Sequence, residues 1–337
     1  MKIAILGCKG TTLDLISFIK ELEVFSVDLV ITLPAKIAQK NQVAFYKGVE
    51  IENLCNKNSI PIYLTNSYNL NDTKDVQFFL NEKIDLLIVI GWERLVPEAV
   101  LAALGKFACG MHGSAFGLPK GRGRSPLNWS LITGQKKFIT YLFKYDPKID
   151  AGNIIGFRSF EINDFDTIAS LHMKNRIAMQ DLLKTYIQLI GENREIAWPQ
   201  PPEKPTFYPK RTPEDSAIDW NQRSMQIYNL IRAVLPPYPP AFCSHNNKKI
   251  YILDACPFDP CLFHNKTLPG TIVDISISLE QFVVKTLDGT ILVKKFSDSS
   301  ILDFKIGDVL ESIPAEVVLK RIKNNYDVSL TDEEKEI

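Results

Sequence analysis

The sequence has 337 residues, 45% of them hydrophobic and 23% charged, which is the composition of a globular protein long enough for two domains. Its 39 lysines and arginines equal its 39 aspartates and glutamates, so the overall charge gives no support for a nucleic-acid binder, although a local basic patch stays open. No leader and no run of roughly 20 apolar residues is evident, and the six cysteines are scattered, so we expect a cytoplasmic protein with reduced thiols and no membrane insertion.

Apolar runs alternate with helical patterns through the first half of the chain. Residues 2–6 form a short apolar run, a helical pattern follows to residue 22, and a second apolar run covers 27–32. This alternation predicts βαβ units and a parallel sheet. Further strands are predicted at 60–64, 84–90, 107–111 and 141–145.

The turn Gly7-Cys8-Lys9-Gly10 contains only half of a dinucleotide-binding fingerprint. The third glycine is missing and no ribose-binding acid follows, so a tight strand-to-helix turn is favoured over an NAD site.

The second half of the chain changes character after a long amphipathic helix predicted at 165–190. Residues 198–213 contain six prolines and no helical period, which predicts a stiff, extended linker. One more helix is expected at 221–234. Short strands separated by turn signals follow and favour a small β-barrel; they are predicted at 249–254, 270–275, 281–286 and 290–295.

The segment from residue 111 to residue 155 contains the side chains most suited to chemistry. His112 lies at the C-terminal end of a predicted strand, where open α/β sheets bind ligands. A glycine-rich loop with Lys120, Arg122 and Arg124 follows, and Asp150 opens an Asp-Ala-Gly sequence. Taken singly, each feature has a plainer reading: a structural histidine, a solvated basic loop and a turn residue.

Taken together, these motifs resemble the formyltransferases that use 10-formyltetrahydrofolate. The resemblance rests on His112-Gly113-Ser114, the loop 118–124 (Leu-Pro-Lys-Gly-Arg-Gly-Arg) and Asp150-Ala151-Gly152. Residues 122–129 look most similar to the enzymes that act on UDP-4-amino-4-deoxy-L-arabinose. The similarity continues through 210–220, 229–233 and 236–242, and so covers most of the chain.

The resemblance implies an α/β, Rossmann-like formyltransferase domain with a mainly parallel sheet, followed by a small OB-like β-barrel domain. On this reading the catalytic domain covers 1–200, a linker 201–220, the barrel 221–330 and a polar tail 331–337.

The resemblance also implies an activity, which is transfer of a formyl group from 10-formyltetrahydrofolate, the co-substrate, to a primary amine of an amino-sugar nucleotide. A methionyl-transfer-RNA formyltransferase ranks second, and a folate-binding relative with little or no turnover ranks third. The oligomeric state stays open.

By the same resemblance, His112 and Asp150 are the catalytic residues. The expected folate contacts are Trp92, Leu95, Val96, Ile149 and Asp150. The expected substrate contacts are Ser114, Lys120, Arg124, Asn128 and Arg211. No metal is expected, because the spacing of Cys256, Cys261 and His264 is unconvincing for a zinc site.

One position departs from the family pattern. The family has an asparagine two residues before the histidine, where it is expected to donate to the developing oxyanion, and this chain has Gly110. Three readings stay open: another side chain such as Asn128 or Asn153 reaches in, the geometry is shifted or uses a water, or turnover is slow or lost. An extra residue between Ser114 and Pro119 is a second departure, which we expect to reshape the acceptor pocket.

Overall fold

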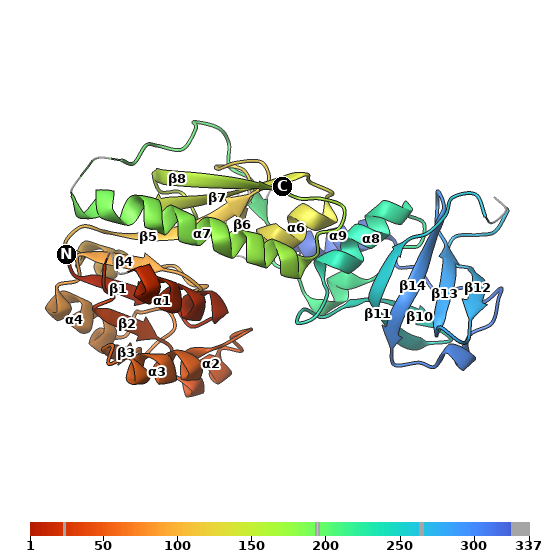
Figure 1. Ribbon diagram of the computed structural model, residues 1–337, viewed down its shortest axis with the longest axis horizontal. Coiled ribbons are helices and arrows are strands. Elements are labelled where there is room, and N and C mark those ends of the chain that lie inside the picture. Colours follow the sequence, from red (N-terminus) through yellow and green to blue (C-terminus); the bar gives the residue numbers. More distant parts are fainter. Residues whose placement is uncertain (23–24, 193, 195, 263–265, 325–337) are drawn as a thin grey trace. The chain divides into compact units, whose positions relative to one another are not determined.

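A computed structural model describes residues 1–22, 25–192, 194, 196–262 and 266–324 (Figure 1). The chain divides into two compact units, and each draws on separate stretches of the sequence. The first unit contains Met1–Gly113, Ile139–Phe160 and Lys174–Lys204, and the second contains Ser114–Phe138, Glu161–Met173 and Pro205–Ile337. The expected polar tail at 331–337 lies outside the described residues.

A mostly parallel sheet forms the centre of the first unit. In the part of the chain that the structure describes, this sheet has seven strands in the order β3-β2-β1-β4-β5-β7-β8. The strands are β1 (Ile3–Leu6), β2 (Leu29–Thr32), β3 (Ile62–Leu64), β4 (Leu86–Val89), β5 (Phe107–Ser114), β7 (Lys137–Lys144) and β8 (Ile154–Glu161). The pairs β1–β2, β2–β3, β1–β4 and β4–β5 are parallel. This arrangement confirms the predicted α/β class.

Alternating side chains of β1 belong to two separate cores, one on each face of the sheet. Ile3 and Ile5 pack with residues of α1 (Gly10–Leu22), α3 (Gly48–Lys57) and α7 (Ile168–Gly191). Ala4 and Leu6 pack with residues of α2 (Ala35–Lys40), α4 (Thr73–Glu82) and α5 (Glu98–Ala102). Because both faces are covered, the central strands are nearly all apolar.

The second unit contains an antiparallel sheet formed by the C-terminal part of the chain (Figure 1). Its strand order is β10-β11-β14-β13-β12, and the strands are β10 (Ala241–His245), β11 (Lys248–Pro257), β12 (Ile272–Ser276), β13 (Gln281–Lys285) and β14 (Thr290–Ser297). The two edges of the sheet are linked by one short segment: Glu311 N–H donates to the Ser244 carbonyl (2.8 Å) and Leu310 N–H to the Gly270 carbonyl (2.8 Å). The sheet is therefore closed on itself, as the predicted barrel requires.

Two short strands and one helix of the second unit connect the basic loop to the proline-rich stretch. The two-residue strand β9 (Phe207–Tyr208) pairs in parallel with β6 (Arg122–Gly123). Trp129, on α6 (Pro126–Ile132), donates its indole N–H to the Pro209 carbonyl at 3.0 Å. The unit also contains the 3-10 turns Pro213–Ser216 and Ile301–Asp303 and the helices α8 (Ser224–Ala233) and α9 (Ala315–Asn324). The stretch predicted as an extended linker is thus hydrogen-bonded to the basic loop through the β6–β9 pairing.

None of the helices in the described ranges is both long enough and apolar enough to cross a membrane. All six cysteines are free thiols.

Candidate active site

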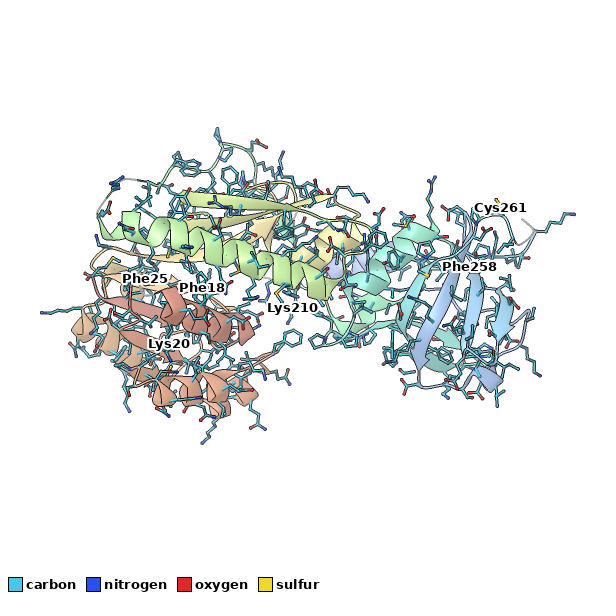
Figure 2. All side chains as sticks on the ribbon, in the orientation of Figure 1. Phe18, Lys20, Phe25, Lys210, Phe258 and Cys261 are labelled. Atoms are coloured by element: carbon cyan, nitrogen blue, oxygen red, sulfur yellow. The ribbon has the colours of Figure 1, made fainter. Side chains whose placement is uncertain are left out.

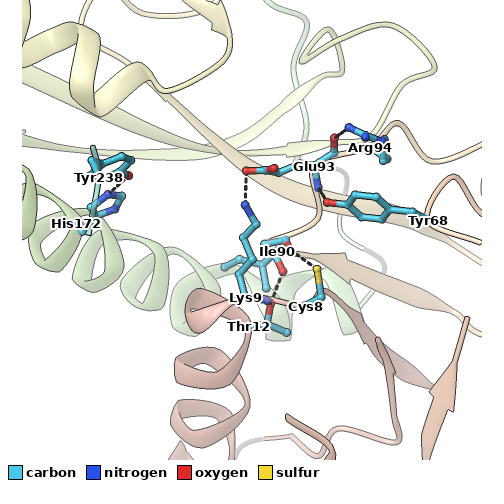
Figure 3. Close-up of polar contacts among 10 residues, drawn as sticks. Cys8, Lys9, Thr12, Tyr68, Ile90, Glu93, Arg94, His172 and Tyr238 are labelled. Atoms are coloured by element: carbon cyan, nitrogen blue, oxygen red, sulfur yellow. Dashed lines mark hydrogen bonds and ion pairs between the residues drawn. The ribbon is translucent and has the colours of Figure 1, made fainter. Parts of the chain in front are cut away.

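The loop after β4 is fixed to the turn between β1 and α1 (Figure 3). Thr12 Oγ1 donates to the Ile90 carbonyl at 2.6 Å, and Lys9 forms an ion pair with Glu93. Gly7 is required by close approach, because a Cβ there would lie 1.9 Å from the Ile90 carbonyl oxygen. Gly7 therefore has a steric role in this turn that needs no dinucleotide, whereas a Cβ on Gly10 would meet no atom within 4 Å.

Trp92 and Val96 of the same loop are core residues. Trp92 is 7% exposed, and its ring meets the edge of Tyr68 at 4.9 Å between centroids. Val96 is 3% exposed, whereas Leu95 is 52% exposed and Ile149 is half-buried. The indole N–H of Trp92 is buried and has no hydrogen-bond partner among the described residues. A buried donor of this kind is stabilised by an acceptor on a bound ligand.

His112 and Asp150, the two predicted catalytic residues, are brought together by the fold of the first unit. His112 lies near the end of β5, and Asp150 lies in the loop between β7 and β8. His112 Nδ1 is 3.4 Å from Asp150 Oδ2. The side chains are 9% and 20% exposed, so the pair is mostly shielded from water. A carboxylate at this position orients the imidazole ring and stabilises the charge that the ring gains when it takes up a proton.

The loop that contains Asp150 is held in an unusual backbone conformation. Asp150 has a φ of +46°, in the left-handed region. Gln200 Nε2 donates to the carbonyls of Asp150 (2.7 Å) and Gly152 (2.9 Å). A Cβ on Gly152 would lie 1.6 Å from the Lys144 carbonyl oxygen, so the Asp-Ala-Gly sequence needs its glycine for close approach. No sequence signal pointed to Gln200, which lies in the proline-rich stretch.

The space beside Gly110 is filled by the ring of Tyr145. A Cβ built on Gly110 would lie 2.2 Å from Tyr145 Cε2 and 3.1 Å from Tyr145 Cζ. A side chain at position 110 and the observed position of this ring are therefore mutually exclusive. Tyr145 was not among the predicted site residues, because a tyrosine at the end of a strand is typical of an ordinary core position.

The two asparagines considered as replacements for the family residue are placed as follows. Asn128 is 4% exposed and belongs to the second unit, where its side-chain amide donates to the Ala233 carbonyl at 2.7 Å. Asn153 is exposed. Asn128 therefore uses its amide to join α6 to the end of α8.

The expected substrate contacts Ser114, Lys120, Arg124 and Arg211 all lie in the second unit. Ser114 is fully buried, and its hydroxyl donates to the Lys120 carbonyl at 2.6 Å. The Lys120 side chain is exposed, and Arg124 is half-buried. Arg211 donates to the Asp215 carbonyl at 2.7 Å and lies over the ring of Trp129 at 5.1 Å. Ser114 shapes the loop, and the three basic side chains are the groups suited to an anion.

The cysteines considered for a zinc site differ in how far they are exposed. Cys243 is buried and Cys256 is half-buried, whereas Cys261, labelled in Figure 2, is exposed. His264 lies outside the described residues. Within the described ranges, no group of three or more histidine, cysteine or acidic residues could hold a metal ion.

Comparison with known proteins identifies the class of protein. The chain matches the formyl transferase family over residues 1–190 and the C-terminal domain of formyl transferases over residues 210–305. The first match covers more than half of the chain, so the protein belongs to the formyl transferase family.

Among curated proteins, the chain is 31% identical over 283 residues to the bifunctional polymyxin resistance protein ArnA of Wigglesworthia glossinidia brevipalpis. The match covers 83% of this chain and 41% of that relative, so the chain spans less than half of the relative's length.

Two solved structures share the fold. The N-formyltransferase from Helicobacter canadensis, in complex with folinic acid and dTDP-3-aminofucose, has a TM-score of 0.61 at 19% identity and covers 88% of this chain and 99% of its own. HypX from Aquifex aeolicus, in complex with tetrahydrofolic acid, has a TM-score of 0.61 at 16% identity and covers 97% of this chain and 48% of its own.

Proposed function

We propose that this protein transfers a formyl group from 10-formyltetrahydrofolate to the primary amine of an amino-sugar nucleotide. The observation that carries the proposal is the shielded His112–Asp150 pair, with Nδ1 and Oδ2 3.4 Å apart at the end of β5. Support comes from membership of the formyl transferase family and from similarity to ArnA. A further support is the shared fold of the N-formyltransferase whose structure contains folinic acid and an amino-sugar nucleotide.

Formyl transfer to an amine needs a group that moves protons beside the reacting carbon. The attacking amine must lose a proton, and the departing N10 of the folate must gain one. A histidine can take part in both transfers near neutral pH, and proton transfer by a positioned side chain contributes about 10²–10⁴-fold. We assign this role to His112 and assign to Asp150 the orientation and charge stabilisation of His112.

We propose that the folate binds beside the loop after β4. Trp92 offers a buried indole N–H to an acceptor, Leu95 and Ile149 offer apolar surface to a flat ring, and Val96 is a core residue of the same loop. Asp150, which lies next to His112, is the remaining residue that we assign to the folate site. The residues thus fit a pterin.

We propose that Lys120, Arg124 and Arg211 bind the diphosphate of the sugar nucleotide, because guanidinium and ammonium groups bind phosphate oxygens strongly. Ser114 and Asn128 support this role indirectly by holding the loop and α6 in shape. The extra residue between Ser114 and Pro119 would alter which sugar fits.

We also propose that residues 1–200 and 221–330 act as catalytic and barrel domains joined by 201–220, and that the protein works in the cytoplasm.

The proposal is tested by measuring tetrahydrofolate release with purified protein, 10-formyltetrahydrofolate and a panel of amines. UDP- and dTDP-linked 4-amino and 3-amino sugars should support release, and simple amines should not. Release with methionyl-transfer RNA, together with transfer-RNA binding that weakens steeply with salt, would favour the second-ranked function instead. Tight folate binding without release for any amine would indicate a binding protein.

A further inference from the structure

We propose that the hydroxyl group of Tyr145 donates the hydrogen bond that stabilises negative charge on the formyl oxygen during transfer. This inference rests on the proposed function and adds a catalytic residue to the same site. It also explains why position 110 is a glycine.

The fold places Tyr145 beside the histidine strand. Tyr145 is the first residue after β7, and its N–H donates to the Ala108 carbonyl of β5 at 2.8 Å. Its ring lies against Gly110, with Cε2 2.2 Å from the position that a Cβ on that glycine would occupy. Because side chains two residues apart on a strand point to the same face, the ring covers the face of β5 to which His112 belongs.

The ring of Tyr145 is held by packing, and its hydroxyl group can donate a hydrogen bond to a ligand. It packs in the core cluster that includes Val89, Trp92 and Val96, the last two being expected folate contacts. It stacks on Phe143 at 5.8 Å with an interplanar angle of 6°. Tyr145 is half-buried, and within the described residues its hydroxyl makes no hydrogen bond to protein. The phenol is thus pre-positioned without being committed to a protein acceptor.

The protonation state of Tyr145 suits a donor. Burial, followed by the negative charge of Asp150, raises the pKa of the Tyr145 phenol above its ordinary value. The phenol therefore keeps its proton at physiological pH. The charge of Asp150 thus acts in the same direction as burial and favours the protonated phenol.

The chemical step requires such a donor. The amine nitrogen attacks the formyl carbon, the π electrons of the carbonyl move to its oxygen, and the charge on that oxygen must be stabilised. When the carbonyl re-forms, the bond to folate N10 breaks, N10 takes up a proton, and the amine nitrogen loses one through His112. No group is oxidised or reduced in this step. Loss of one hydrogen-bond donor to the oxyanion typically lowers the rate about 10²–10³-fold.

Tyr145→Phe tests the inference, because it removes the hydroxyl and keeps the ring. We expect kcat to fall about 10²–10³-fold with little change in the KM for the folate. Tyr186→Phe is the matched control: its ring also covers a strand glycine, with Cε2 2.2 Å from a Cβ built on Gly156. We expect this control to keep the wild-type kcat. A Tyr145→Phe protein as active as wild type would overturn the inference and leave the proposed function intact.

A second measurement keeps the inference testable if wild-type protein formylates no amine, which would refute the proposed function instead. The carbonyl stretch of ¹³C-formyl-labelled 10-formyl-5,8-dideazafolate is recorded on the protein by difference infrared spectroscopy. A hydrogen bond from Tyr145 lowers this frequency, so it should rise in Tyr145→Phe and stay low in Tyr186→Phe. If Tyr145→Phe does not fold, 3-fluorotyrosine at position 145 should lower the frequency further. An identical frequency in wild type and variant would disprove the hydrogen bond.

Discussion

The contact between Gly110 and Tyr145 predicts a large effect from one added methyl group. In Gly110→Ala the new Cβ would lie 2.2 Å from Tyr145 Cε2 and 3.1 Å from the Val89 carbonyl oxygen. The ring must move, and overpacking of this kind costs about 1–3 kcal/mol. At about 2–4 °C per kcal/mol, we expect the unfolding midpoint to fall by about 2–12 °C in a thermal denaturation experiment.

The steric origin of this effect is checked in a second background. In Tyr145→Ala the ring is absent and only the 3.1 Å approach to the Val89 carbonyl oxygen remains, so adding Gly110→Ala should cost much less than it does in the wild-type background. Gly10→Ala is the control for the added methyl group. Gly10 is the first residue of α1, and a Cβ there would meet no atom within 4 Å. Equal destabilisation by Gly110→Ala in both backgrounds would show that the tyrosine ring is not the obstacle.

Three further predictions concern the site loop and the buried thiols. Asp150→Asn removes the charge beside His112, and we expect kcat/KM to fall about 10²–10⁴-fold with a changed pH–rate profile; an unaltered profile would rule out the pairing. Gly152→Ala places a Cβ 1.6 Å from the Lys144 carbonyl oxygen, so both the thermal midpoint and the rate should fall, and retention of both would contradict the tight loop. Burial raises the pKa of the Cys55 thiol from 9.0 to about 11, so the folded state keeps a proton that the unfolded chain loses, and stability should decline as the pH rises from 9.0 toward 11. Urea titrations across that range should show a shallower decline for Cys55→Ala, and parallel curves would refute this origin.

The parallel strands were predictable from sequence because they are buried on both faces. β1, β2 and β4 are nearly continuous apolar runs, and each lies within or beside its predicted range. β8 was not predicted, because its outer half alternates between exposed and half-buried residues. β10 was not predicted either; it is only five residues long and follows a run of prolines.

Short helices were also missed, although one had a usable signal. The helix α4 begins after Asp72, whose side chain accepts a hydrogen bond from the Lys74 N–H at 2.8 Å. An aspartate before a helical pattern is a common N-cap. The helices α2 and α5 have six and five residues, too few to show a hydrophobic period.

Within the candidate site, His112 and Asp150 could be found from sequence because they stand in short motifs. Tyr145 and Gln200 could not, because their roles depend on how β7 and the proline-rich stretch pass β5 and the Asp150 loop. Gly110 was visible as a departure from the family pattern. The reason for this departure is that the ring of Tyr145, which follows the neighbouring strand β7, occupies the space beside Gly110, and this contact cannot be seen in the sequence.

The central claim is formyl transfer at the His112–Asp150 pair, and transfer of isotopic label tests it most directly. Purified protein is incubated with 10-formyltetrahydrofolate labelled with ¹³C in the formyl group and with an amino-sugar nucleotide, and the sugar is analysed by mass spectrometry. We predict a labelled formamide with wild-type protein and a strongly reduced yield with His112→Ala. Equal yields from the two proteins, or no labelled product with any amino sugar, would contradict the account.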